Sequence, residues 1–176
     1  VLTPADTLVL SGSVPPSLPG DVYARIASIA AEKGARLVVD AAGKLLLSTL
    51  PHRPFLIKPN REELSALFGA PADTDEAVQA LAHHLQEAGA HHVLVSMAGD
   101  GALLCTASGE SYRVAAAKGT VVNSVGAGDS MVGGFLAAFQ KTGSLPEALA
   151  LGAAAGGATA FSVGIAGFQK VMALYE

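Results

Sequence analysis

The sequence has a single cysteine, Cys105, no tryptophan, and few aromatic residues, which make up 5% of its 176 positions. One cysteine excludes a disulfide within the chain and fits a reducing compartment. Charged residues are also scarce, at 15%, and the formal net charge of −4 gives no basic track for a nucleic acid to follow. We therefore expect a cytoplasmic protein that does not bind nucleic acid.

The sequence also lacks a convincing membrane segment. Residues 148–168 carry no charged side chain and include the GxxxG spacing of Gly152 and Gly156, which packed transmembrane helices use. However, alanine, glycine, serine and threonine dominate this stretch, so its transfer into lipid would gain little free energy. We expect a helix buried inside a globular domain and no membrane partner.

Apolar residues make up 51% of the chain, and they are arranged as alternating strands and helices. Short apolar runs predict strands at 7–10, 36–40, 55–58 and 92–96. Helical spacing of apolar residues predicts helices at 21–33, 75–88, 126–140 and 146–160, with a short helix at the C-terminus. Segments 102–106 and 111–114 are typical of an antiparallel hairpin. The sequence therefore predicts an α/β fold with a mainly parallel sheet flanked by helices.

The pattern shows no linker, repeat or charge run, so we predict a single domain over residues 1–176. The chain starts at Val1 without an initiator methionine or the features of a signal peptide. We expect it to begin inside a longer protein.

Several common site motifs are missing. The P-loop pattern GxxxxGK[ST] and the nucleophile pattern GxSxG do not occur, and Asp129-Ser130-Met131 stands where a dinucleotide fingerprint needs its third glycine. The His83-His84 and His91-His92 pairs do not predict zinc, because adjacent residues do not share a helix or strand face and no cysteine cluster completes a site.

The most informative segment is Asn123-Ser124-Val125-Gly126-Ala127-Gly128-Asp129, which leads into a predicted helix. Glycines at a helix start let the backbone N–H groups converge on an anion, where the helix dipole also favours negative charge. Asp129 in the first turn is then suited to accept a hydroxyl proton. Spacing alone leaves the alternative open that Asp129 merely caps the helix.

Two further segments follow predicted strands. In Lys58-Pro59-Asn60-Arg61-Glu62-Glu63, Asn60 and Glu63 have the spacing of a capping box, which requires no other function. In Ser96-Met97-Ala98-Gly99-Asp100-Gly101, both glycines are expected to be needed for a tight turn, with or without a ligand.

These segments together resemble the ribokinase-like carbohydrate kinases of the PfkB family, in the family's order along nearly the whole chain. The form Asn-Ser-Val-Gly-Ala-Gly-Asp-Ser-Met is similar to that of bacterial 1-phosphofructokinases, with tagatose-6-phosphate kinases close behind. The resemblance implies that Asp129 is the catalytic base and that Gly126, Ala127 and Gly128 form the anion hole. It implies a metal site for Mg²⁺ at Asn60 and Glu63. The nucleotide-binding residues that it implies are Lys58, Asn60, Ser96, Gly99, Gly101, Asn123, Ser124, Val125, Ala153 and Gly157.

The expected activity is phosphorylation of a sugar phosphate by ATP and Mg²⁺, with fructose 1-phosphate as the first choice of acceptor. Members of the family have an additional N-terminal half with sugar-binding residues and a small lid, and nothing in this sequence matches that half. The resemblance implies that a homodimer could form through the lid. Two alternatives therefore stay open: tagatose-6-phosphate kinase activity, or a truncated module that binds nucleotide without turnover. A dinucleotide-dependent oxidoreductase is disfavoured by the order of the motifs.

Overall fold

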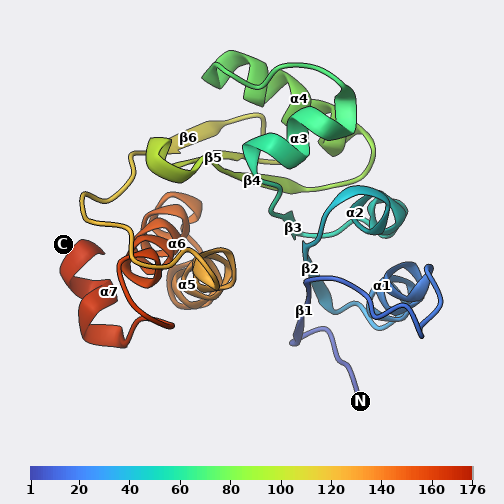
Figure 1. Cartoon of the computed structure of the whole chain (residues 1–176). Coiled ribbons are helices and arrows are strands. Elements are labelled where there is room, and N and C mark those ends of the chain that lie inside the picture. The colour runs from blue at the N-terminus through green and yellow to red at the C-terminus, as the bar shows by residue number, and fades with distance from the viewer. Residues whose placement is uncertain (176) are drawn as a thin grey trace. The chain divides into compact units, whose positions relative to one another are not determined.

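The computed structural model describes residues 1–175 (Figure 1). The strands are β1 (Thr7–Ser11), β2 (Arg36–Asp40), β3 (Leu56–Ile57), β4 (His92–Ser96), β5 (Ala102–Cys105) and β6 (Ser111–Val114). The α-helices are α1 (Val22–Glu32), α2 (Gly43–Thr49), α3 (Arg61–Phe68), α4 (Asp75–Glu87), α5 (Ala127–Thr142), α6 (Leu145–Ala160) and α7 (Phe168–Tyr175), and two 3-10 turns are η1 (Leu50–His52) and η2 (Ala98–Asp100).

The strands form one sheet in the order β1-β2-β3-β4-β5-β6. The first four strands are parallel, with Leu8 opposite Leu37, Val38 opposite Leu56, and Leu56 opposite His92. Strands β5 and β6 are joined by a short turn in which the Thr106 amide donates to the carbonyl of Glu110. The predicted α/β fold with a mainly parallel sheet and one antiparallel pair is confirmed.

The chain groups into two compact units. The first contains residues 1–95 and 104–111, and the second contains residues 96–103 and the chain from Tyr112 onward. The division passes through β5 and not through a polar linker, and the single domain expected over residues 1–176 stays a prediction.

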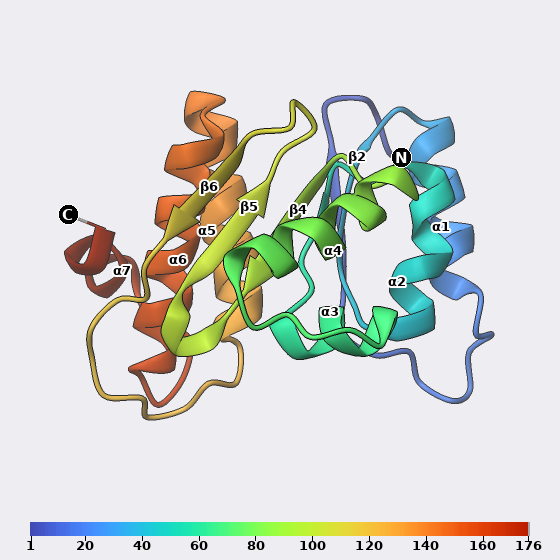
Figure 2. The same ribbon diagram turned by 90° about the horizontal axis from the view of Figure 1, so that it is seen from above.

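In the first unit, the unbroken apolar runs of β2 and β3 form the centre of the core. Val38, Val39, Leu56 and Ile57 are fully buried, as expected for parallel strands covered on both faces. Helices α1 and α2 lie side by side next to β1 and β2 (Figure 2), and Leu46 of α2 is fully buried. Helix α2 was not predicted, because Gly43–Thr49 is too short to show a helical period.

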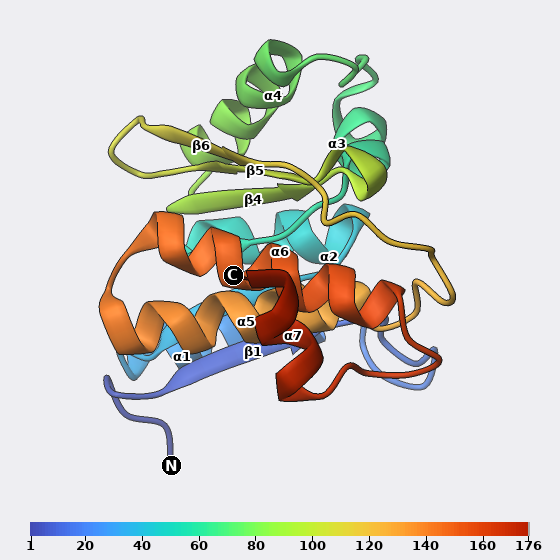
Figure 3. The same ribbon diagram turned by 90° about the vertical axis from the view of Figure 1, so that its left-hand side faces the viewer.

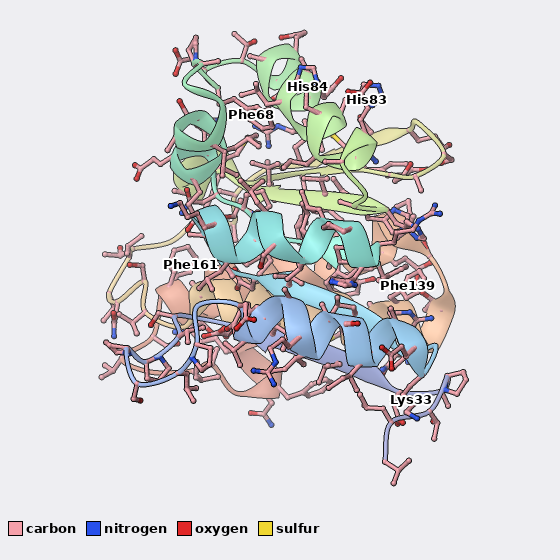
Figure 4. The ribbon with its side chains drawn as sticks, turned by 90° about the vertical axis from the view of Figure 1, so that its right-hand side faces the viewer. Lys33, Phe68, His83, His84, Phe139 and Phe161 are labelled. Atoms are coloured by element: carbon pink, nitrogen blue, oxygen red, sulfur yellow. The ribbon has the colours of Figure 1, made fainter. Side chains whose placement is uncertain are left out.

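Helices α3 and α4 begin at well-formed caps. Asn60 and Glu63 make a complete capping box: Asn60 Oδ1 accepts the Glu63 amide at 2.7 Å, and Glu63 Oε2 accepts the Asn60 amide at 2.9 Å. Figure 4 labels Phe68 of α3 and His84 of α4, whose ring centroids lie 5.6 Å apart. The predicted capping box is therefore present.

In the second unit, α5 and α6 pack closely and antiparallel, and α7 lies beside α6 (Figure 3). A Cβ atom on Gly134 would lie 2.8 Å from the Leu151 carbonyl oxygen, and one on Gly152 would lie 2.8 Å from that of Met131. Small residues thus bring the two helix backbones together, which accounts for the GxxxG spacing in α6. Within residues 1–175, no helix is long and apolar enough to cross a membrane.

Candidate active site

The first turn of α5 is built as the glycine motif predicts. Gly126 is the N-cap residue, with φ 81° in the left-handed region, and no side chain caps this end of the helix. A side chain at Gly126 would also lie 2.6 Å from Ile165 Cδ1. The turn is therefore glycine-dependent, and no side chain occupies the positive end of this 16-residue helix, where an anion could bind. One of its amides is already in use, because the Ala127 amide donates to the Ser124 carbonyl at 3.1 Å.

Asp129 is the third residue of α5 and is exposed to solvent. It is not the N-cap residue, because Gly126 occupies that position. This excludes the N-cap position for Asp129, but a purely helix-stabilising role of its charge in the first turn stays an alternative. An exposed carboxylate beside a row of helix-start amides is placed where it could accept a proton from a group close to a bound anion.

The loop before α5 is braced by Asn123. The Asn123 backbone amide donates to the Ala160 carbonyl at 3.1 Å, its side-chain Oδ1 accepts the Val125 amide at 3.0 Å, and its Nδ2 donates to the Val163 carbonyl at 3.3 Å. Asn123 thus ties this loop to the segment after α6. The predicted contact of Asn123 with a nucleotide stays a prediction, as it does for Ser124 and Val125, the exposed residues that follow it.

The 96–101 segment forms a tight turn in which only one of the two glycines is required. The Met97 amide donates to the Gly101 carbonyl at 2.8 Å, and Gly101 has φ 90°. A Cβ atom on Gly101 would lie 2.1 Å from the Val114 carbonyl oxygen, whereas one on Gly99 would meet nothing within 4 Å. The expectation that the reversal needs both glycines holds for Gly101 and not for Gly99. A ligand contact by Ser96 stays a prediction.

Ala153 and Gly157 lie on α6. A Cβ atom on Gly157 would lie 3.1 Å from Ala117 Cβ and 3.8 Å from Leu174 Cδ1, so the small residue serves local packing. The predicted position of these two residues beside a nucleotide base stays a prediction.

In the first unit, Lys58 is buried in an ion pair. Its Nζ lies 3.1 Å from Asp40 Oδ1, and the two side chains are 7% and 18% exposed. Tyr23 completes this cluster: its hydroxyl donates to the Ser11 carbonyl at 2.7 Å, and burial together with the negative charge of Asp40 raises the Tyr23 pKa. Lys58 thus has a structural partner, Asp40, that was not predicted from the sequence. The available signal was that Asp40 ends a buried strand, where site residues of parallel sheets gather.

Asn60 and Glu63 follow Lys58 and are half-buried. Their capping bonds use Asn60 Oδ1 and Glu63 Oε2. Carboxylate and amide oxygens are ligands that suit Mg²⁺, which commonly keeps several of its waters. The donor set fits a magnesium ion held through water. Within residues 1–175, no three His, Cys, Asp or Glu side chains converge on a point where they would hold a metal by themselves.

A hollow of about 400 Å³ lies between α4 and the β5–β6 turn, lined by residues that include Glu76, His83, Cys105 and Glu110. It contains none of the predicted site residues. Burial raises the pKa of the Cys105 thiol, so this group is a poor nucleophile at neutral pH. We assign no chemistry to this hollow.

Residues 1–170 match the sequence profile of the pfkB family carbohydrate kinases. This chain belongs to the pfkB family. It is 48% identical over 161 residues to the 1-phosphofructokinase of Bacillus subtilis, covering 92% of this chain and 53% of the relative. It is 39% identical over 171 residues to the D-tagatose-1-phosphate kinase of Bacillus licheniformis, covering 97% of this chain and 56% of the relative. This pfkB chain thus spans about half the length of the curated relatives that it matches.

Among solved structures, this pfkB chain is similar to phosphofructokinase-2 from Escherichia coli, solved in complex with substrates and products. The TM-score is 0.91 with 31% identity, over 99% of this chain and 57% of that one. The fold is also that of Arabidopsis thaliana ribokinase, with a TM-score of 0.83 over 97% of this chain and 55% of that one at 23% identity. These likenesses confirm the predicted ribokinase-like fold and the carbohydrate kinase family.

Proposed function

We propose that this chain carries the nucleotide-binding and phosphoryl-transfer part of a sugar-phosphate kinase, with fructose 1-phosphate as the acceptor. The observation that carries the proposal is the first turn of α5, where Gly126 in the left-handed conformation leaves the helix start without a side-chain cap, beside exposed Asp129. Membership of the pfkB family and the likeness to the B. subtilis 1-phosphofructokinase support it.

In the proposed reaction, Asp129 accepts the proton of the acceptor hydroxyl while the hydroxyl oxygen forms a bond to the γ-phosphorus of ATP. The bond from this phosphorus to the bridging oxygen breaks, and ADP leaves with that oxygen and its electron pair. The amides of Gly126 and Gly128 stabilise negative charge on the transferring group. Their contribution is electrostatic and does not require a covalent intermediate. The Ala127 amide is a weaker candidate for this role, because it donates to the Ser124 carbonyl at 3.1 Å.

We assign Mg²⁺ binding to Asn60 and Glu63 through water, on the basis of the oxygen donors described above. When bound, Mg²⁺ neutralises part of the phosphate charge. Lys58 is a weaker candidate for a direct phosphate contact, because its ammonium group is paired with Asp40.

The test is ADP release from Mg-ATP and fructose 1-phosphate by the wild-type chain and two matched variants. Asp129→Asn removes the base, and we expect turnover to fall by about 10²–10⁴-fold. The control is Glu147→Gln, because Glu147 is the third residue of α6 just as Asp129 is the third residue of α5. Glu147→Gln should keep turnover within about twofold, since a first-turn acid contributes only about 0.3–1 kcal/mol to a helix. Equal turnover in wild type and Asp129→Asn would contradict the proposal.

The acceptor is tested with the same assay on a panel of sugar phosphates. Relatives named D-tagatose-1-phosphate kinases make D-tagatose 1-phosphate the main competitor, and D-tagatose 6-phosphate tests the alternative predicted from the sequence. A higher kcat/KM for either tagatose ester than for fructose 1-phosphate would reassign the acceptor without changing the reaction class.

A second candidate function is nucleotide binding without turnover. It is favoured by the chain spanning 53% of the B. subtilis relative. Calorimetry with Mg-ATP separates the two functions: binding without ADP release from any acceptor would favour the binding module, and turnover would exclude it. The predicted homodimer would form through the family's lid, so it is tested by light scattering on a longer protein that includes that lid.

A further inference from the structure

Thr159 is a buried hydroxyl that connects three segments of the second unit. It lies near the end of α6 and is 1% exposed. Its Oγ1 donates to Ser130 Oγ at 2.8 Å and accepts the Ala166 amide at 3.1 Å. Both hydrogen-bonding functions of the hydroxyl are therefore in use, as a buried polar group requires.

The partner on α5 belongs to the turn that carries the proposed base. Ser130 follows Asp129 directly, and its amide donates to the Gly126 carbonyl at 2.9 Å. The Thr159–Ser130 bond thus attaches the first turn of α5 to the end of α6. A shift of this turn would move Asp129 and the Gly126 amide together.

The other partner belongs to the segment 161–167, which covers the same turn. Ile165 from this segment reaches the position that a Gly126 side chain would occupy, and the Val163 carbonyl accepts from Asn123 Nδ2. Lys170 Nζ of α7 fixes the start of the segment by donating to the Phe161 carbonyl and to Ser162 Oγ. Thr159 therefore hydrogen-bonds both to this segment and to the first turn of α5.

We propose that Thr159 is a positioning residue for phosphoryl transfer: the relay from the Ala166 amide through Thr159 Oγ1 to Ser130 Oγ holds Asp129 and its neighbouring amides in register with segment 161–167. The proposal rests on the function proposed above for Asp129. The hydroxyl acts and the methyl group does not, because only Oγ1 makes these two bonds. A displacement of catalytic groups by about 1 Å can cost as much as about 10²-fold in rate, so a loosened turn has a measurable effect.

The test compares Thr159→Val, which keeps the shape and removes the hydroxyl, with Thr159→Ser, which keeps the hydroxyl. The matched control is Thr142→Val at the other end of α5, because Thr142 Oγ1 also makes one bond as donor and one as acceptor. It donates to the Ala138 carbonyl and accepts the Ser144 amide. We expect Thr159→Val to lower kcat about tenfold with KM for the sugar phosphate unchanged within about twofold. Thr159→Ser should restore kcat, and Thr142→Val should leave it unchanged.

A second readout does not depend on activity. Amide hydrogen exchange followed by NMR on the wild-type chain and the same variants should show faster exchange in Thr159→Val at Ala166, Ala127 and Ser130. The Gly143 amide, which is bonded to the Phe139 carbonyl at the far end of α5, should not change. Ser130→Ala removes the same bond from the other side, and its effect on kcat should not add to that of Thr159→Val.

The two proposals fail in different ways. Full activity in Asp129→Asn would overturn the proposed function. Faster exchange confined to Ala166, or unchanged exchange at all three amides, would overturn the positioning role of Thr159 even if the chain had no turnover. Failure of Thr159→Ser to restore wild-type exchange and kcat would also overturn it, because the methyl group and not the hydroxyl would then be responsible.

Discussion

Lys58 Nζ and Asp40 Oδ1 form a buried ion pair at 3.1 Å, joining the residue after β3 to the last residue of β2. Lys58 is predicted from the sequence as a nucleotide ligand, yet the structure gives it a partner inside the protein. The pair connects the carboxyl ends of the neighbouring strands β2 and β3. Asn60 and Glu63 lie just beyond the same end of β3, at the start of α3.

The first prediction concerns this pair. Lys58→Met removes the cation that pairs with the Asp40 carboxylate. We expect the free energy of unfolding to fall by about 3 kcal/mol. This is the low end of the range for broken buried pairs, because the Asp40 side chain is 18% exposed. Urea denaturation measures it. The double variant Lys58→Met/Asp40→Asn should recover part of the loss, and a double variant less stable than Lys58→Met would contradict the assignment.

The second prediction concerns the pH dependence of stability. Burial, with a smaller contribution from His91, lowers the His92 pKa to about 4, and His92 Nδ1 accepts the Ala107 amide at 3.2 Å. The unfolded chain binds a proton near pH 6.5 and the folded chain does not, so the stabilising contribution is present above pH 6.5 and declines as the pH falls towards 4.

We expect about 1–2 kcal/mol to be lost across this window, after allowance for solvent screening of a half-buried ring. His92→Asn, which keeps an acceptor near Nδ1 and cannot titrate, should flatten the decline. Thermal unfolding at pH 7 and pH 4.5 measures both proteins. If the stabilities of wild type and His92→Asn fell equally between pH 7 and pH 4.5, another group would be responsible.

The third prediction compares two glycines in one turn. Gly101→Ala places a Cβ atom 2.1 Å from the Val114 carbonyl oxygen at φ 90°, and we expect a loss of at least about 2 kcal/mol in the free energy of unfolding. Gly99→Ala meets open space without a positive φ and should be neutral within about 0.5 kcal/mol. Chemical denaturation of both variants checks the contrast, and equal losses would refute it.

The fourth prediction concerns Gln86 of α4. Its Nε2 donates to the His91 carbonyl at 3.0 Å and to the Thr106 carbonyl at 2.8 Å, so one amide group connects the helix to the segments around β4 and β5. Gln86→Leu should cost about 1–3 kcal/mol, because these carbonyls lose their donor. Gln79→Leu on the same helix, at an exposed position, is the control. A Gln86→Leu protein as stable as the control would show that water replaces the amide without cost.

Much of the fold was accessible to prediction because its signals are local. The runs at 36–40 and 92–96 match β2 and β4, and the periodic segment 75–88 contains α4. The strand ends that differ from the prediction are those set by hydrogen bonds to neighbouring strands. Strand β3, for example, is limited to Leu56–Ile57 within the predicted 55–58 segment. Helix α2 escaped because seven residues do not complete two turns of a periodic pattern.

The candidate site was predictable only in part. Glycine spacing and the adjacent carboxylate pointed to the first turn of α5, because the left-handed N-cap at Gly126 depends on that residue and its immediate neighbours. The partners of that turn were not predictable. Thr159 lies 29 residues from Ser130, and nothing in its neighbourhood distinguishes a relay hydroxyl from any buried threonine.

The sequence by itself determined the alternation of most strands and helices, the capping box at Asn60 and Glu63, and the glycine-led turn before Asp129, since each depends on residues a few positions apart. Tertiary structure alone decided that Lys58 pairs with Asp40, that Gly101 and not Gly99 is indispensable, and that Thr159 connects α5 to segment 161–167. These contacts join residues distant in the chain, and they exist only once folding has closed the intervening loops.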